Sequence, residues 1–192
     1  LIGQGSLANT HDLSLIARRW QAFYFDAKVK VKFNPFNYQQ MAGLTNYYND
    51  RHWSFVFITW NEINGKVIEL GENNRGKYTS YLKDDAIKVP DHVEEVWFRT
   101  KVRKETYSYE YSFDGVEFTE IPVRLDAAIL SDDYVLQSYG GFFTGAFVGL
   151  AAVDYSGYDA SAEFYHFDYQ ELGDTLIASD AYSWEASELR GY

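Results

Sequence analysis

Carboxylates are the side chains of this sequence best suited to acid–base chemistry. The chain has 28 Asp and Glu residues, with adjacent pairs at residues 84–85, 94–95 and 132–133. General acid–base catalysis by two carboxyl groups needs both groups positioned within reach of the reacting atoms. No spacing in the sequence brings two such groups together. We interpret the three pairs as solvated turns or strand ends, and we predict no catalytic residue.

Asp154 and Asp168 are flanked by apolar residues, which favours partial burial. We expect these carboxylates to bind turn N–H groups or arginines. Calcium ligation is the alternative, because hard cations take carboxylate and carbonyl oxygens. Since the ligands are not grouped in the sequence, no metal site is predicted.

Side chains that commonly act as nucleophiles or metal ligands are scattered or missing. The histidines, at positions 11, 52, 92 and 166, lack the spacing that directs two imidazoles to one metal, and we interpret them as structural. There is no cysteine, no GxSxG motif and no glycine-rich phosphate loop before a lysine. We therefore expect neither a metal nor a cofactor.

A glycine-rich aromatic segment, YGGFFTGAFVGLAAVD at residues 139–154, is the clearest candidate for a functional loop. Its two leading glycines permit backbone angles closed to other residues. They precede Phe142, Phe143 and Thr144, and a buried strand is expected directly afterwards. The two phenylalanines either belong to a loop that the scaffold presents, or they cap the core.

An aromatic cluster surrounds the predicted turn NDRH at residues 49–52. Tyr47, Tyr48 and Trp53 could form a sugar platform, because a ring face packs on the C–H face of a pyranose. Cross-strand packing of the rings is the alternative.

Composition excludes several classes of function. The formal net charge of −11 repels phosphate backbones, so nucleic acid is not an expected partner. No apolar run approaches the roughly 20 residues of a membrane span, and the first residues do not resemble a signal peptide. The lack of cysteine suits a reducing compartment, and we expect a cytoplasmic protein.

Alternation with a period of two predicts an all-β fold that positions these residues. Predicted strands span residues 23–33, 41–48, 52–60, 66–71, 77–82, 94–102, 107–113, 146–153 and 163–169. Asn64-Gly65 and Asp114-Gly115 are hairpin dipeptides, which imply antiparallel pairing. We expect a two-sheet antiparallel β-sandwich of jelly-roll type over residues 1–172, with one helical turn near 125–133. Residues 173–192 lose the pattern and are predicted to be a C-terminal extension.

Three strings also carry a resemblance to a known family. They are SLIARRWQAFYFDAKVKVKFNP from Ser14, QQMAGLTNYYNDRHWSFVFITW from Gln39 and GGFFTGAFVGLAAVD from Gly140, with YSYEYSFDGVEFTEI between the last two. Together they resemble the C-terminal concanavalin A-like domain of family 43 glycoside hydrolases, the β-xylosidases and α-L-arabinofuranosidases. The resemblance covers residues 1–172.

The resemblance implies that catalysis belongs to a separate five-bladed propeller, which holds two Asp and one Glu and precedes the sandwich. It also implies that a sandwich loop places a phenylalanine at the mouth of the substrate pocket. The FTGAFVG string carries that role to Phe143, with Phe142 as the alternative. The opening LIGQGSL resembles the family's first strand cut at its start, so we expect a fragment of a larger enzyme. Arg18 and Arg19 would lie at the domain interface, or would form an ordinary charge pair at a strand edge.

Three hypotheses of function follow. The first is an accessory domain that docks on the catalytic propeller of the same polypeptide and helps to shape a pocket for xylo-oligosaccharides or arabinosides. The second is an autonomous carbohydrate-binding module that uses Tyr47, Tyr48 or Trp53. The third is a free-standing hydrolase, for which turnover by this chain alone is not expected.

Overall fold

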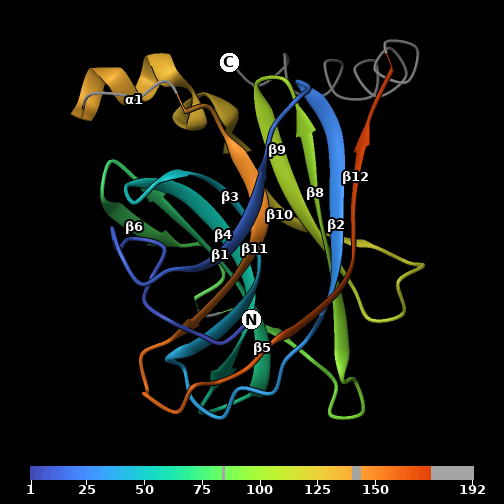
Figure 1. The fold of residues 1–192 in the computed structure, drawn as a ribbon. Coiled ribbons are helices and arrows are strands. Elements are labelled where there is room, and N and C mark those ends of the chain that lie inside the picture. Colours follow the sequence, from blue (N-terminus) through green and yellow to red (C-terminus); the bar gives the residue numbers. More distant parts are fainter. Residues whose placement is uncertain (84, 140–143, 174–192) are drawn as a thin grey trace.

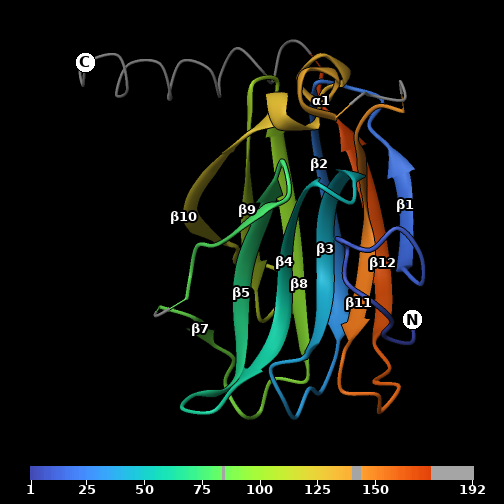
Figure 2. The same cartoon turned by 90° about the vertical axis from the view of Figure 1, so that its left-hand side faces the viewer.

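Two antiparallel β-sheets lie face to face and enclose one apolar core (Figure 1 and Figure 2). The computed structural model describes residues 1–83, 85–139 and 144–173. One sheet contains, in spatial order, β1 (Ser14–Arg19), β11 (Phe147–Asp154), β3 (Gln40–Asn49), β4 (His52–Asn61), β5 (Gly65–Asn74) and β6 (Lys77–Ser80), with β7 (Ile87–Lys88) also paired to β5. The other contains β10 (Thr119–Asp126), β9 (Thr106–Ser112), β8 (Glu95–Arg103), β2 (Tyr24–Lys32) and β12 (Glu163–Glu171).

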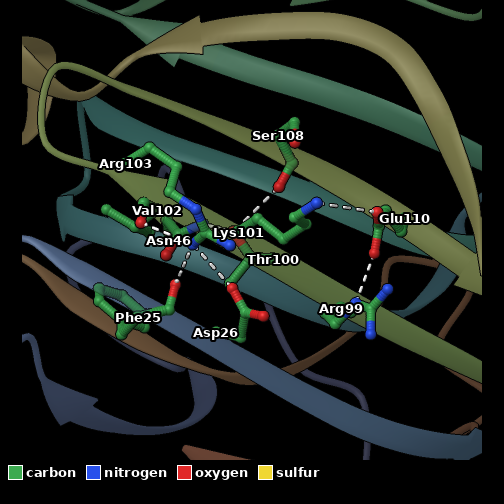
Figure 3. A network of polar contacts seen from close by, with 10 residues as sticks. All are labelled: Phe25, Asp26, Asn46, Arg99, Thr100, Lys101, Val102, Arg103, Ser108 and Glu110. Carbon is green, nitrogen blue, oxygen red and sulfur yellow. Dashed lines mark hydrogen bonds and ion pairs between the residues drawn. The ribbon is translucent and has the colours of Figure 1, made fainter. Parts of the chain in front are cut away.

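The core forms because alternate side chains of each strand point between the sheets. On β2, Phe25 and Val29 are fully buried, while Lys28 and Lys30 lie on the outer face. A buried polar link crosses this core: the Asn46 amide of β3 donates to the Thr100 hydroxyl of β8 at 3.0 Å (Figure 3) and to the Tyr109 hydroxyl at 2.8 Å. These bonds hold the two sheets in a fixed relation, because the polar groups that they pair would be costly to leave buried and unpaired.

The outer face of the five-stranded sheet carries paired charges (Figure 3). Glu110 is 6% exposed and binds both Arg99 and Lys101, the latter at 3.5 Å. Arg103 binds the Asp26 carboxylate at 2.8 Å on the neighbouring strand β2. The five charged side chains drawn in Figure 3, three basic and two acidic, thus all have a partner of opposite sign on this face.

The predicted sandwich is confirmed, and each of the nine predicted strands has a counterpart. The hairpin glycines have φ of 74° at Gly65, the first residue of β5, and 75° at Gly115, in the β9–β10 connection. Strands β1, β7 and β10 were not predicted. The first lies at a sheet edge without clean alternation, the second has two residues, and the third contains Pro122 and a register shift between Glu120 and Arg124.

The predicted helical turn corresponds to the 3-10 helix η1 (Ala127–Leu130), and the α-helix α1 (Asp132–Tyr139) that follows was missed. Within the described part of the chain, neither helix is long and apolar enough to cross a bilayer. Both helices lie at one end of the sandwich, between β10 and β11 in the chain (Figure 1). They therefore precede the glycine-rich segment and help to fix where it begins.

Candidate functional site: the anchored base of the glycine-rich loop

The glycine-rich segment connects α1 to β11 at the helical end of the sandwich. Phe142 and Phe143, with the two glycines before them, lie outside the described residues. The description resumes at Thr144, which is half-buried, and continues through Gly145 and Ala146 into β11. Thr144, Gly145 and Ala146 thus form the described end of the loop, and neighbouring elements hold them in place.

Strand β1 holds the outgoing side of the loop. The Arg19 guanidinium, at the end of β1, donates a hydrogen bond to the Thr144 carbonyl and lies 5.1 Å from the centre of the Phe147 ring. The backbone N–H of Trp20 donates to the Ala146 carbonyl at 2.8 Å. These contacts extend the β1–β11 ladder to the last residues of the loop, so the chain leaves the sheet in a defined direction.

The Asp132 carboxylate ties the loop to the core. It accepts hydrogen bonds from the Tyr48 hydroxyl, near the end of β3, and from the Gly145 N–H at 3.2 Å. Burial, followed by this hydrogen bond, raises the pKa of the Tyr48 phenol above its usual value. Gly145 has a φ of 69°, a conformation that favours glycine. One side chain thus fixes the start of α1, the end of β3 and the exit of the loop.

A second set of contacts holds α1 against the edge of the sheet. The Tyr134 hydroxyl donates to the Asn74 side-chain oxygen at 3.1 Å, and the Arg75 guanidinium lies 4.4 Å from the centre of the Tyr134 ring. His52 is fully buried beneath, with its ring centre 6.0 Å from that of Tyr134. Burial and then the Arg75 charge lower the pKa of His52, so a neutral ring packs under the helix. His52 has the structural role expected of it.

The two arginines proposed for an interface behave differently from each other. Arg19 holds the loop, as described above. Arg18 lies 3.8 Å from the centre of the Tyr169 ring and donates to the Gln21 side chain. Within the described ranges neither guanidinium is paired with a carboxylate, so the alternative of a strand-edge charge pair is not observed there.

The three rings of the predicted sugar platform do not share one surface. Tyr47 and Trp53 are directly opposed on β3 and β4 and pack on the outer face of the seven-stranded sheet. Tyr48 points the other way, into the core between the sheets. Trp53 is 5% exposed and Tyr48 is 4% exposed, so cross-strand and core packing account for both.

Known proteins resemble this chain over almost all of the described sandwich. The family model "Beta xylosidase C-terminal Concanavalin A-like domain" matches residues 1–170. This chain belongs to that family. A protein of Escherichia coli (strain K12) is 43% identical over 172 residues, and a beta-xylosidase of Bacillus subtilis (strain 168) is 40% identical over 171 residues. These matches cover 90% and 89% of this chain, and 32% of each relative.

Solved structures agree with the family assignment. The crystal structure of xylan beta-1,4-xylosidase from Bacillus halodurans superimposes with a TM-score of 0.83 at 31% identity, over 89% of this chain and 32% of that one. This concanavalin A-like domain thus spans about one third of the length of the relatives that it matches. The resemblance inferred from the sequence strings is confirmed.

The carboxylates of this domain that the sequence singled out have ordinary partners. Asp154 accepts from the N–H groups of Ser156 at 2.7 Å and Ala160 at 2.8 Å, the turn role predicted for it. Asp168 lies 3.6 Å from the Lys28 ammonium. Among the residues that the structure describes, no three His, Asp or Glu side chains gather as metal ligands would.

Sequence reasoning missed the importance of Asp132, which we interpreted as part of a solvated pair. Its neighbour Asp133 follows on the first turn of α1, whereas Asp132 turns to Tyr48 and Gly145. Because its two partners lie 84 and 13 residues away in the chain, no local pattern reveals the contact. The glycine at position 145, just before a predicted strand, was the one available signal.

Proposed function

We propose that this domain is the accessory sandwich of a β-xylosidase-type glycoside hydrolase. It docks on a catalytic propeller in the same polypeptide and shapes the pocket for xylo-oligosaccharides or arabinosides with the loop that contains Phe142 and Phe143. Family membership over residues 1–170, in relatives about three times as long, is the observation that carries the proposal.

The anchored base of the loop supports a positioning role. A ring that closes a pocket on another domain acts only when its location is fixed, because displacement of a positioning group by about 1 Å can cost two orders of magnitude in rate. Arg19 and Asp132 hold Thr144 and Gly145, the residues that follow the two phenylalanines in the sequence. The ring would exclude water from the bound sugar and favour short oligosaccharides over polymer.

Arg18 and Arg19 have different roles in this proposal. Arg19 supports the loop from within the domain. Arg18 lies on the same edge strand, next to the exposed side chain of Ile16, and has no carboxylate partner in the described part of the chain. A planar guanidinium can bind a carboxylate through two parallel hydrogen bonds. We assign Arg18 to the contact with acidic groups of the catalytic domain, and hydrolysis to the carboxylates of that domain.

The test replaces each phenylalanine in the full-length parent enzyme. Phe142→Ala or Phe143→Ala, whichever ring closes the pocket, lowers kcat/KM for xylobiose by about tenfold or more, since each 1.4 kcal/mol of lost transition-state stabilisation is a factor of ten. Ile63→Ala, at a 90% exposed position on the β4–β5 hairpin, is the control and leaves kcat/KM unchanged. Unchanged kinetics in both phenylalanine variants would overturn the loop role.

A further inference from the structure

A cavity of about 170 Å³ opens at the end of the sandwich opposite α1. Its walls come from the end of β2, the β2–β3 connection and the β11–β12 loop, which lie together far from the helices (Figure 1 and Figure 2). We call it the end pocket; its lining residues are Lys32, Phe33, Asn34, Phe36, Gln40, Ala160, Ser161 and Glu163. None of these residues takes part in the loop site described above.

The end pocket is far from the loop. Gln40 begins β3 at the pocket, and Tyr48 lies eight residues later at the Asp132 contact. At about 3.3 Å per residue, these positions are roughly 26 Å apart along the strand. A ligand in the end pocket is therefore not the sugar that the loop would cover.

The walls of the end pocket are held in place before any ligand arrives. The fully buried Gln40 side chain accepts from the Phe36 N–H at 3.0 Å and donates to the Ser156 hydroxyl at 3.0 Å, which joins the two loops. The Ala160 N–H is bound by Asp154, and the Ala160 carbonyl accepts from Gly3 at 2.8 Å. Pre-organised walls reduce the entropy that binding would otherwise lose.

Two exposed aromatic rings stand at the end pocket. Phe36 is 57% exposed and Tyr158 is 70% exposed, and their centres lie 5.2 Å apart in an edge-to-face arrangement. Phe36 lines the cavity, and Tyr158 supports its ring from the β11–β12 loop. An aromatic face offers apolar contact to a ligand that is itself partly apolar, as the C–H face of a sugar ring is.

The end pocket is lined by hydrogen-bond donors and acceptors, and its lining includes one basic and one acidic side chain, Lys32 and Glu163. The Lys32 ammonium is paired with Glu94 at 3.1 Å and also feels the charge of the Glu163 carboxylate, which accepts from the Tyr165 hydroxyl. Opposite charges thus lie close together at the pocket, so it does not present a single sign that would attract an ion. Asn34 accepts from Lys66 at 3.5 Å through its oxygen, which leaves its amide N–H groups available. Ser161 adds a hydroxyl from an exposed residue of the lining. A neutral ligand whose hydroxyls both donate and accept matches this set.

We propose that the end pocket binds one sugar unit of a neutral oligosaccharide. The unit lies against the Phe36 ring, with its hydroxyls on Asn34, Ser161 and Glu163. The cavity is smaller than the roughly 300–1,000 Å³ of typical ligand pockets, so it holds a single ring and leaves the rest of the saccharide in solvent. This site shares no described residue with the anchored base of the loop.

The experiment titrates the 192-residue chain with xylotriose by calorimetry and by amide NMR. We expect saturable binding with a Kd on the order of 1 mM, and shifts confined to amides near residues 34–36 and 160–163. Phe36→Ala weakens binding about tenfold, a loss equal to about 1.4 kcal/mol. Ile63→Ala, equally apolar at the surface but outside the cavity, keeps the parent affinity.

A second variant distinguishes a loss of binding from a loss of folding. Ser161→Trp fills the cavity from an exposed position, so it abolishes binding while the thermal midpoint stays that of the parent. The proposal is overturned if xylotriose gives no saturable signal at concentrations about ten times the expected Kd, if Phe36→Ala and Ser161→Trp bind as the parent does, or if inorganic phosphate competes for the same amides. Because no catalytic domain is present in this test, its failure would leave the loop proposal intact.

Discussion

At the scale of single residues, the Asp132 carboxylate holds the site together. It contacts β3 and the outgoing end of the loop at the same time, through Tyr48 and Gly145. Hydrogen bonds to a charged acceptor are roughly twice as strong as those between neutral groups. The contact thus both stabilises the fold and fixes the chain next to Phe143.

Tyr48→Phe tests this contact with the removal of one oxygen atom. The free energy of unfolding should fall by about 1–3 kcal/mol, because the variant removes a charge-assisted hydrogen bond from a residue that is 4% exposed. Urea denaturation of the 192-residue chain measures the change. Tyr38→Phe, at a 66% exposed position, is the matched control and should change stability by no more than about 0.5 kcal/mol. Equal stabilities for the two variants would contradict the assigned role of Asp132.

The lowered pKa of the buried His52 imidazole should make the free energy of unfolding depend on pH. Its pKa is lowered in the folded state, so the unfolded chain binds a proton first as the pH falls through about 6.5. Stability is therefore highest above that pH and decreases below it. Among the groups that face the ring, Arg75 and Arg51 lower the pKa further, and Asp50 opposes them.

The measurement compares urea midpoints of the parent and of His52→Gln between about pH 8 and pH 5. The parent should lose stability across this range, and the variant should show a shallower decrease because it has no imidazole at the buried position. If the urea midpoints of the parent and of His52→Gln fall in parallel with pH, burial of a neutral His52 is not the cause of the lost stability.

At the scale of elements, edge strand β1 performs a task that its sequence does not reveal. The burial of SLIARR does not alternate cleanly, yet the strand pairs with β11 along its whole length and ends in the arginine that holds Thr144. Arg19 and Thr144 are 125 positions apart in the chain, so this contact forms only when β1 has joined the sheet.

Arg19→Ala should therefore loosen the exit of the loop without unfolding the sandwich. Amide hydrogen exchange over residues 144–147 is expected to accelerate, because the guanidinium that binds the Thr144 carbonyl is removed. Exchange in β12 should stay at the parent rate. Arg18→Ala is the control, since its side chain packs on Tyr169 rather than on the loop. Unchanged exchange at 144–147 would show that β1 does not anchor the loop.

Strand periodicity made most of the fold predictable, because one face of each long strand is buried and the other is wet. The alternation in β2 and β8 is the clearest case. Helix α1 was not predictable in the same way, since among its described side chains Val135 is buried in the core and Tyr134 packs against it, which is too few for a clear helical period. The sugar platform at Tyr47, Tyr48 and Trp53 failed as a single surface for a related reason: adjacent residues on a strand face opposite sides.

At the scale of the whole molecule, the two ends of the sandwich have different roles. The helical end carries the anchored loop and the edge strand with Arg18, and we assign it to the catalytic domain. The opposite end carries the end pocket with Phe36, and we assign it to a separate sugar unit. The core between them, crossed by the bonds of Asn46, keeps the two ends in a fixed relation.

The most direct test of the central claim is the substrate preference of the full-length parent enzyme in which both Phe142 and Phe143 are replaced by alanine. We predict that kcat/KM for xylobiose falls by about tenfold or more while kcat/KM for xylohexaose falls less, because an opened pocket no longer favours the short substrate. Equal kcat/KM values for parent and variant on both substrates would contradict the account.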